Sequence, residues 1–201
     1  MFRLGWLRDV PAQIWAIAGM LRGEGAAKSG SLLALGVDLS ALKNLTVWPN
    51  TPDARRVFAA SKLVLMPSLM ENAGCIAREA MFNGMPVLAS NRGGLPETVG
   101  GGEQGARSLE QGEGSAGFLF DIPARYTHQT RELPSAKDVA PWVETIIRLW
   151  DDAAYYERFS LAACERAQAW HPDRLAPLYR EFFSRCITNE KPSIGKHHDA
   201  A

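Results

Sequence analysis

The chain has 201 residues, and its 22 Lys and Arg residues balance its 22 Asp and Glu residues. This balance excludes an electrostatic case for binding nucleic acid or a strongly anionic membrane. The three Cys residues are widely spaced, which argues against a disulfide framework or a metal knuckle and favours reduced thiols. The length suits one domain with its own core, residues 1–187, followed by a polar tail, residues 188–201, which we expect to be disordered.

The amino-terminal quarter predicts two short strands, residues 13–20 and 45–48, on either side of a Gly-rich loop. That loop, residues 22–31, contains Lys28 and fits either a cation for a phosphate or a flexible surface loop. Trp48 ends the second strand, and its side chain fits either the core or a platform for a base.

Residues 63–97 predict two successive crossover units of a parallel sheet. Strands are expected at residues 63–66 and 87–89, because both runs are short, apolar and bounded by turn residues. Asn72 is expected to cap the intervening helix. The helix face expected to be buried comprises Ile76, Ala77, Ala80 and Met81. The stop and turn signals are Asn83-Gly84, Arg92-Gly93-Gly94 and Pro96.

Two helix starts should therefore meet at the carboxyl edge of the sheet, where open α/β sheets bind their ligands. Free N–H groups are expected near residues 73–76 and 95–97, and they would attract a phosphate. Glu71 and Glu79 would repel that phosphate, so we expect them to accept hydrogen bonds from hydroxyl groups. Glu79 would stand about six residues above the helix start, roughly 9 Å at 1.5 Å per residue, and meet a ribose diol there.

Several short motifs follow one another along the chain: Pro67-Ser68, the spacing of Glu71 and Glu79, Glu79-Ala80-Met81, Gly84, Pro86-Val87, Gly93-Gly94, Pro96-Glu97 and Gly117-Phe118-Leu119. Over roughly residues 10–185, this order resembles the donor-binding half of a GT-B glycosyltransferase of the retaining nucleotide-sugar group often called group 1. The resemblance implies an α/β fold, with a Rossmann-like parallel sheet flanked by helices and a run of helices at its carboxyl end.

In that family the first Glu contacts the donor sugar near its reacting carbon, and the second holds the nucleotide ribose. The resemblance therefore implies a catalytic role for Glu71 and a donor-binding role for Glu79. The other donor-binding residues that we carry over are Trp48, Asn50, Ser68, Asn72, Ala73, Gly74, Cys75, Gly93, Gly94, Leu95 and Glu97. The implied substrate is a UDP-, GDP- or ADP-linked sugar, with no cofactor and no obligatory metal, and the sequence has no Asp-x-Asp motif.

Three residues of this region keep two interpretations each. Arg92 fits a phosphate contact or a place in solvent. Cys75, in the first helical turn, fits core packing or the lining of a donor pocket, because no base partner for a catalytic thiol is visible. Glu97 fits an interaction with the helix dipole or a role in shaping its turn.

The resemblance also predicts what the chain does not supply. In the family, an Arg and a Lys that neutralise the diphosphate come from upstream loops, and the acceptor binds another domain. We therefore interpret the chain as amino-terminally truncated and expect a missing amino-terminal GT-B domain or a partner chain. Two alternatives stay open: a non-catalytic nucleotide-binding fragment or subunit of a split transferase, and a GT-B sugar-nucleotide epimerase.

The carboxyl-terminal part begins with an expected loop at residues 100–115 and a strand at residues 117–121, followed by an irregular segment. Helical periodicity then predicts three helices, at residues 139–150, 153–170 and 175–186. The apolar face of the last helix comprises Leu175, Leu178, Tyr179, Phe182 and Phe183. This face would pack on the same domain or, as in the family, on the amino-terminal half.

The sequence favours a cytoplasmic location. Arg3 and Arg8 precede an apolar run, as in a secretory signal peptide, but Asp9 and Pro11 interrupt it. No run reaches the roughly 18 apolar residues that a spanning helix needs. Contact with the inner face of the membrane stays open, and polysaccharide biosynthesis is the expected process.

Overall fold

A computed structural model describes residues 14–17, 45–48, 55–100, 116–127, 129–130 and 132–188 of the chain. Its strands are β1 (Ile14–Ile17), β2 (Leu45–Trp48), β3 (Val64–Met66), β4 (Val87–Ser90) and β5 (Gly117–Phe120). Its helices are α2 (Arg55–Ala60), α3 (Cys75–Phe82), α4 (Leu95–Val99), α5 (Ala136–Asp151), α6 (Ala153–Ala167), the short 3₁₀ helix η4 (Gln168–Trp170) and α7 (Pro172–Thr188). The predicted strands and long helices are confirmed. The predictions for Lys28, Asn50 and residues 101–115 lie outside the described residues.

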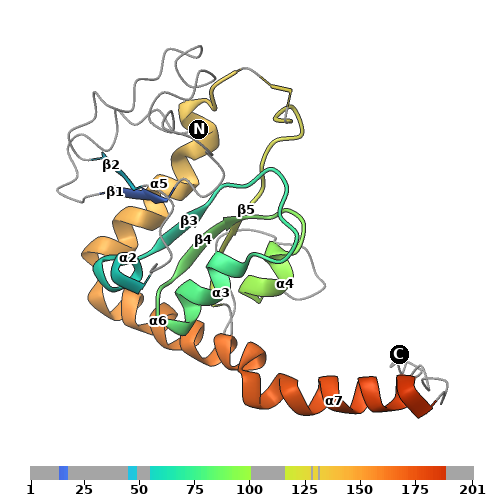
Figure 1. Cartoon of the computed structure of the whole chain (residues 1–201). Coiled ribbons are helices and arrows are strands. Elements are labelled where there is room, and N and C mark those ends of the chain that lie inside the picture. The colour runs from blue at the N-terminus through green and yellow to red at the C-terminus, as the bar shows by residue number, and fades with distance from the viewer. Residues whose placement is uncertain are drawn as a thin grey trace, which may run out of the picture.

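The described strands form two parallel sheets (Figure 1). In the larger sheet the strand order is β3-β4-β5, and Val87 lies opposite both Val64 and Gly117. In the smaller sheet β1 pairs with β2. No ladder joins the two sheets within the part of the chain that the structure describes. Each strand of the larger sheet is followed by a helix, which is the crossover pattern that the sequence predicted.

Helices cover both faces of the larger sheet, and successive residues of a strand face opposite cores. Val87 and Ala89 face a core formed with α3, α4 and α6. Leu88, between them, faces a second core formed with α5 and α6, in which Phe118 and Phe159 lie 4.3 Å apart between ring centroids. Because both faces are packed, the carboxyl edge of the sheet is the place where loops can build a site.

Helix α3 begins later than predicted. Its N-cap is Gly74 and not Asn72, and no side chain caps the helix. Gly74 has a left-handed backbone with φ 57°, and a Cβ there would lie 2.9 Å from Cδ2 of Leu95. The predicted buried face is confirmed for Ala77, Ala80 and Met81. It is wrong for Ile76, which is 47% exposed in the first turn of the helix.

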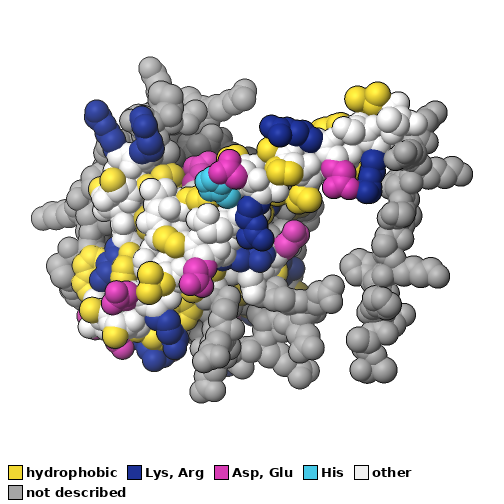
Figure 2. Space-filling view, turned by 90° about the horizontal axis from the view of Figure 1, so that it is seen from below, with side chains coloured by type: hydrophobic (Ala, Val, Ile, Leu, Met, Phe, Trp, Pro, Cys, Tyr) yellow, Lys and Arg dark blue, Asp and Glu magenta, His cyan; other side chains and the backbone are white. Residues whose placement is uncertain are grey.

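Helix α7 projects away from the body of the molecule (Figure 1). None of its residues is buried, and four of its apolar side chains, Leu178, Tyr179, Phe182 and Phe183, are between 55% and 61% exposed. In Figure 2 hydrophobic side chains stand beside Arg and Glu side chains on this projecting helix. Of the two alternatives for this apolar face, packing on the same domain is therefore wrong for these four side chains, and packing on an amino-terminal half stays a prediction. None of the described helices is both long and apolar enough to cross a membrane.

Candidate functional site

The β3–α3 loop, residues 67–74, rests against the turn that follows β4. The N–H of Gly94 donates to the carbonyl of Glu71 at 3.0 Å. The hydroxyl of Thr98 donates to the carbonyl of Ala73, also at 3.0 Å. The two crossover units that the sequence predicted are thus joined at the carboxyl edge of the sheet.

Only glycine allows this close approach of the two backbones. A Cβ at Gly93 would lie 1.9 Å from the carbonyl oxygen of Glu71, and one at Gly94 would lie 2.0 Å from that of Asn72. Gly93 also has a left-handed φ of 55°, which other residues adopt at a cost. The Gly-Gly pair therefore fixes the height of the β3–α3 loop above the sheet.

Glu71 is half-buried in this loop. Its Oε1 accepts a hydrogen bond from the N–H of Asn72 at 3.1 Å. No second donor to this carboxylate occurs among the described residues, so the other oxygen can accept a hydrogen bond from a ligand hydroxyl. Asn72 is exposed and does not cap α3, so its predicted role as a capping residue is wrong.

Glu79 is the fifth residue of α3, about 6 Å along the axis from Cys75 at 1.5 Å per residue, and it is exposed. The first N–H groups of a helix lack intrahelical acceptors, and here the bond from Arg78 N–H to the carbonyl of Gly74 opens the ladder. Open N–H groups of residues 75–77 therefore lie along the chain between Glu71 and Glu79. The catalytic and donor-binding roles of these two residues stay predictions.

The start of α4 has fewer free N–H groups than the sequence predicted. Helix α4 has five residues. The N–H of Leu95 donates to the carbonyl of Arg92 at 3.2 Å, and Pro96 has no N–H. The predicted free N–H groups at these two positions are therefore wrong. Glu97 lies in the first turn and is exposed, as its predicted dipole interaction requires.

The remaining predicted residues lie in different environments. Arg92 is half-buried, and its Nη2 donates to the carbonyl of Ile122 at 2.7 Å. The interpretation that its side chain lies in solvent is therefore wrong. Cys75 is exposed, so its packing in the core is wrong, and its place in the lining of a donor pocket stays a prediction. Ser68, half-buried in the β3–α3 loop, accepts at its carbonyl a hydrogen bond from the Ser90 hydroxyl at 2.5 Å. Trp48 is the last residue of strand β2.

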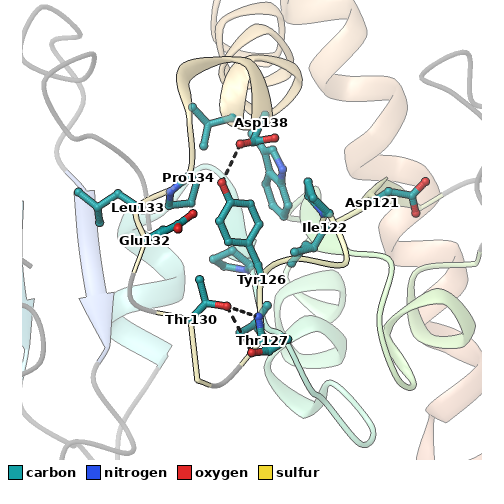
Figure 3. A pocket seen from close by; sticks show the side chains of 14 residues that line it. Asp121, Ile122, Tyr126, Thr127, Thr130, Glu132, Leu133, Pro134 and Asp138 are labelled. Atoms are coloured by element: carbon teal, nitrogen blue, oxygen red, sulfur yellow. Dashed lines mark hydrogen bonds between the residues drawn. The ribbon is translucent and has the colours of Figure 1, made fainter.

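A cavity of about 260 Å³ lies beside this loop and was not predicted (Figure 3). The β3–α3 loop contributes Pro67 and Leu69, and the segment after β5 contributes Ile122 and Tyr126. The rest of its lining is Asp121, Pro123, Thr127, Thr130, Glu132, Leu133, Pro134, Asp138, Val139 and Trp142. The sequence pattern does not predict this cavity, because apolar residues recur with no regular period in residues 123–134.

Asp138 organises one wall of the cavity. Its Oδ2 accepts from the N–H and hydroxyl of Ser135, from the hydroxyl of Tyr126 and from Nη2 of Arg125, at 2.5 to 2.9 Å. These bonds, that of the Ser135 hydroxyl first, hold the pKa of Asp138 well below its ordinary value, and the Asp138 bond raises the pKa of Arg125. The Ser-x-x-Asp spacing is a sequence signal that could have predicted this capping box, although not the cavity beside it.

Residues 8–110 match the family model described as glycosyl transferases group 1, which is slightly more than half of the 201 residues. The chain belongs to this family. The resemblance drawn from its motifs is thereby confirmed, and Glu71, Glu79 and the Gly-Gly pair all lie within the matched range.

A curated relative of this group 1 chain is D-inositol 3-phosphate glycosyltransferase of Rhodococcus opacus (strain B4). The two are 33% identical over 135 residues, which cover 64% of this chain and 30% of the relative. Across the curated relatives described as D-inositol 3-phosphate glycosyltransferases, the matched region spans between 20% and 32% of their length. The chain thus spans about a third or less of the length of the relatives that it matches.

Two solved structures share the fold. A glycosyltransferase from Rickettsia africae ESF-5 superposes with a TM-score of 0.61 at 13% identity, over 92% of this chain and 43% of the other. Anabaena HepE in complex with UDP-glucose superposes with a TM-score of 0.56 at 22% identity, over 90% and 43%. The GT-B fold class that the sequence predicted is confirmed by these likenesses.

Proposed function

We propose that this group 1 chain supplies the donor-binding half of a retaining glycosyltransferase. The complete enzyme moves a sugar from a nucleotide-diphosphate sugar to a glycan or a lipid-linked acceptor. The observation that carries the proposal is the backbone contact between Glu71 and the Gly93-Gly94 turn at the carboxyl edge of the sheet. This contact holds Glu71 beside the start of the helix that bears Glu79.

In this proposal the diphosphate lies at the open N–H groups of residues 75–77, where the helix dipole favours negative charge. The ribose diol donates hydrogen bonds to Glu79, and the donor sugar lies toward Glu71. The same N–H groups stabilise the leaving diphosphate as the anomeric C–O bond loosens. The proposal requires no cofactor and no obligatory metal.

Known relatives support a sugar nucleotide as the donor. The Rhodococcus opacus relative is named a glycosyltransferase, and the structure of HepE was determined with UDP-glucose. Membership of the group 1 family also favours sugar transfer over epimerisation. UDP is therefore the nucleotide to try first.

The acceptor-binding half would come from another domain or from a partner chain. The apolar face of α7, with side chains such as Tyr179 and Phe182 in solvent, supports a partner that covers it. A nucleotide-binding subunit of a split transferase is the second candidate. It is supported by the two separate described sheets, because the edge strands of each could pair with a strand of another chain.

Calorimetric titration of the full chain with UDP, GDP and ADP tests the donor site. We expect saturable binding of one nucleotide. Glu79→Ala should weaken it about 10- to 100-fold, because a hydrogen bond to a charged group contributes roughly 1.5–3 kcal/mol. Glu157→Ala is the matched control, since Glu157 is an exposed residue of α6.

The outcomes separate clearly. If the wild-type chain is folded by circular dichroism and binds none of the three nucleotides, the proposed donor site is wrong. If Glu157→Ala weakens binding as much as Glu79→Ala, the nucleotide does not lie on α3.

A further inference from the structure

Two buried hydroxyls hold the β3–α3 loop from below. Thr98, on α4, donates to the carbonyl of Ala73 at 3.0 Å, and Ser90, at the end of β4, donates to the carbonyl of Ser68 at 2.5 Å. Between these two bonds, Gly94 N–H donates to the carbonyl of Glu71. Three carbonyls of one loop are therefore tied to the β4–α4 unit.

Both hydroxyls are buried, so each needs its hydrogen-bond acceptor. Ser90 and Thr98 are both 0% exposed, and their neighbours Leu95 and Val99 on α4 are apolar and 0% exposed. A valine at position 98 would have nearly the same shape as threonine, so packing alone does not require a hydroxyl there. A buried hydroxyl is costly unless it is bonded, and the carbonyl of Ala73 is its acceptor.

The bond from Thr98 also bears on the start of α3. In a continuous helix the carbonyl of Ala73 would accept from the N–H of Ala77, four residues later. Here that carbonyl accepts from Thr98, Gly74 turns into the left-handed region, and the ladder opens only with Arg78. The N–H of Ala77 is thus left for another acceptor.

We infer that Thr98, assisted by Ser90, is a positioning residue for the donor site, and that it acts by holding the carbonyl of Ala73 away from the first turn of α3. The inference rests on the proposed function, because it concerns the same diphosphate position. Thr98 itself touches no substrate. It sets the direction of the N–H groups of residues 75–77 and the place of Glu71 in the loop.

The test compares Thr98→Val, which keeps the shape, with Thr98→Ser, which keeps the hydroxyl. We expect Thr98→Val to lower UDP affinity about tenfold, as the loss of one well-directed bond does, and Thr98→Ser to restore affinity to within about threefold. Val99→Ala, a buried truncation on the same helix that leaves the carbonyl of Ala73 bonded, controls for a general loss of stability. It should lower the melting temperature while UDP affinity stays unchanged.

Amide hydrogen exchange without ligand gives a second, independent readout. Exchange of the amides at residues 73–77 should be faster in Thr98→Val than in wild type and than in Val99→Ala. If Thr98→Val binds UDP as wild type does, or if Thr98→Ser fails to restore affinity, the positioning role is wrong. If wild type binds no nucleotide, the proposed function fails, and unchanged exchange in Thr98→Val would then overturn the positioning role separately.

Discussion

Of the connections at the carboxyl edge of the larger sheet, the β3–α3 loop and the segment after β5 are held by different forces. The β3–α3 loop is fixed by backbone contacts that two glycines permit, with a hypothetical Cβ of Gly93 only 1.9 Å from the carbonyl oxygen of Glu71. The segment after β5 is fixed by side chains that converge on one carboxylate, Asp138. The first loop therefore depends on close backbone packing and on hydrogen bonds between uncharged groups, and the second depends on charge.

The two loops should therefore respond differently to pH. Steric contacts do not titrate, so the shape of the β3–α3 loop should change little with pH. A charge-assisted network is lost when its acceptor is protonated. A ligand site built on the β3–α3 loop should therefore keep its geometry at a low pH that weakens the hydrogen bonds to Asp138.

The largest effect is expected from Gly93→Ala. The new Cβ must displace the backbone of Glu71, and the residue must also keep a left-handed φ. We expect a loss of unfolding free energy of about 3 kcal/mol or more, with loss of UDP binding. Chemical denaturation and calorimetric titration would measure both.

Gly84→Ala is the matched control for backbone strain. Gly84 has a similar φ of 67°, but its Cβ would meet only side-chain atoms closely, Oγ of Ser160 at 3.1 Å and Sγ of Cys164 at 3.2 Å. It should cost about 1–2 kcal/mol and leave UDP affinity unchanged. Equal losses in the two variants would contradict the steric account of the β3–α3 loop.

An intermediate effect is expected from Asp138→Asn, and it should depend on pH. Because the folded-state pKa of Asp138 is lowered, its charge contributes stability above the ordinary carboxyl pKa near 3.9. This stability is lost as pH falls through the folded-state pKa. The gap in melting temperature between wild type and Asp138→Asn should therefore be full at pH 7 and shrink below about pH 4. A gap that stays constant down to pH 3 would show that the charge is not the cause.

The smallest effect is expected from Tyr126→Phe. Oδ2 of Asp138 keeps the donors of Ser135 and Arg125, so the loss should be about 1 kcal/mol or less in unfolding free energy. UDP affinity should stay as in wild type, because no contact of the β3–α3 loop is removed. A tenfold fall in UDP affinity would instead make the cavity beside Tyr126 part of the nucleotide site.

The strands and long helices were predictable because their patterns are strong. Residues 63–66 and 87–89 are short apolar runs between turn signals, and the sequence after residue 135 keeps a helical period through three helices. The start of α3 was not predictable in the same way. Asn72 is a good capping residue by type, but the N-cap is Gly74, in a left-handed backbone with no room for a Cβ beside Leu95, and that packing is tertiary.

Some residues of the candidate site were predictable from local sequence, and others were not. Glu71, Glu79 and the Gly-Gly pair could be proposed from local spacing and from the family resemblance. The hydroxyls of Ser90 and Thr98 could not, because their acceptors lie 22 and 25 residues away along the chain. The cavity beside Tyr126 also depends on contacts between distant elements, although the Ser-x-x-Asp cap at its edge is a local signal.

The central claim is that a nucleotide diphosphate binds between the β3–α3 loop and the first turn of α3. The most direct measurement is a titration of the ¹⁵N-labelled full chain with UDP, followed by amide NMR shifts. The account predicts the largest shift changes at residues 71–79, with smaller ones at residues 93–98 and little change on α7. Largest changes around Ile122 and Tyr126, or on α7, would contradict it.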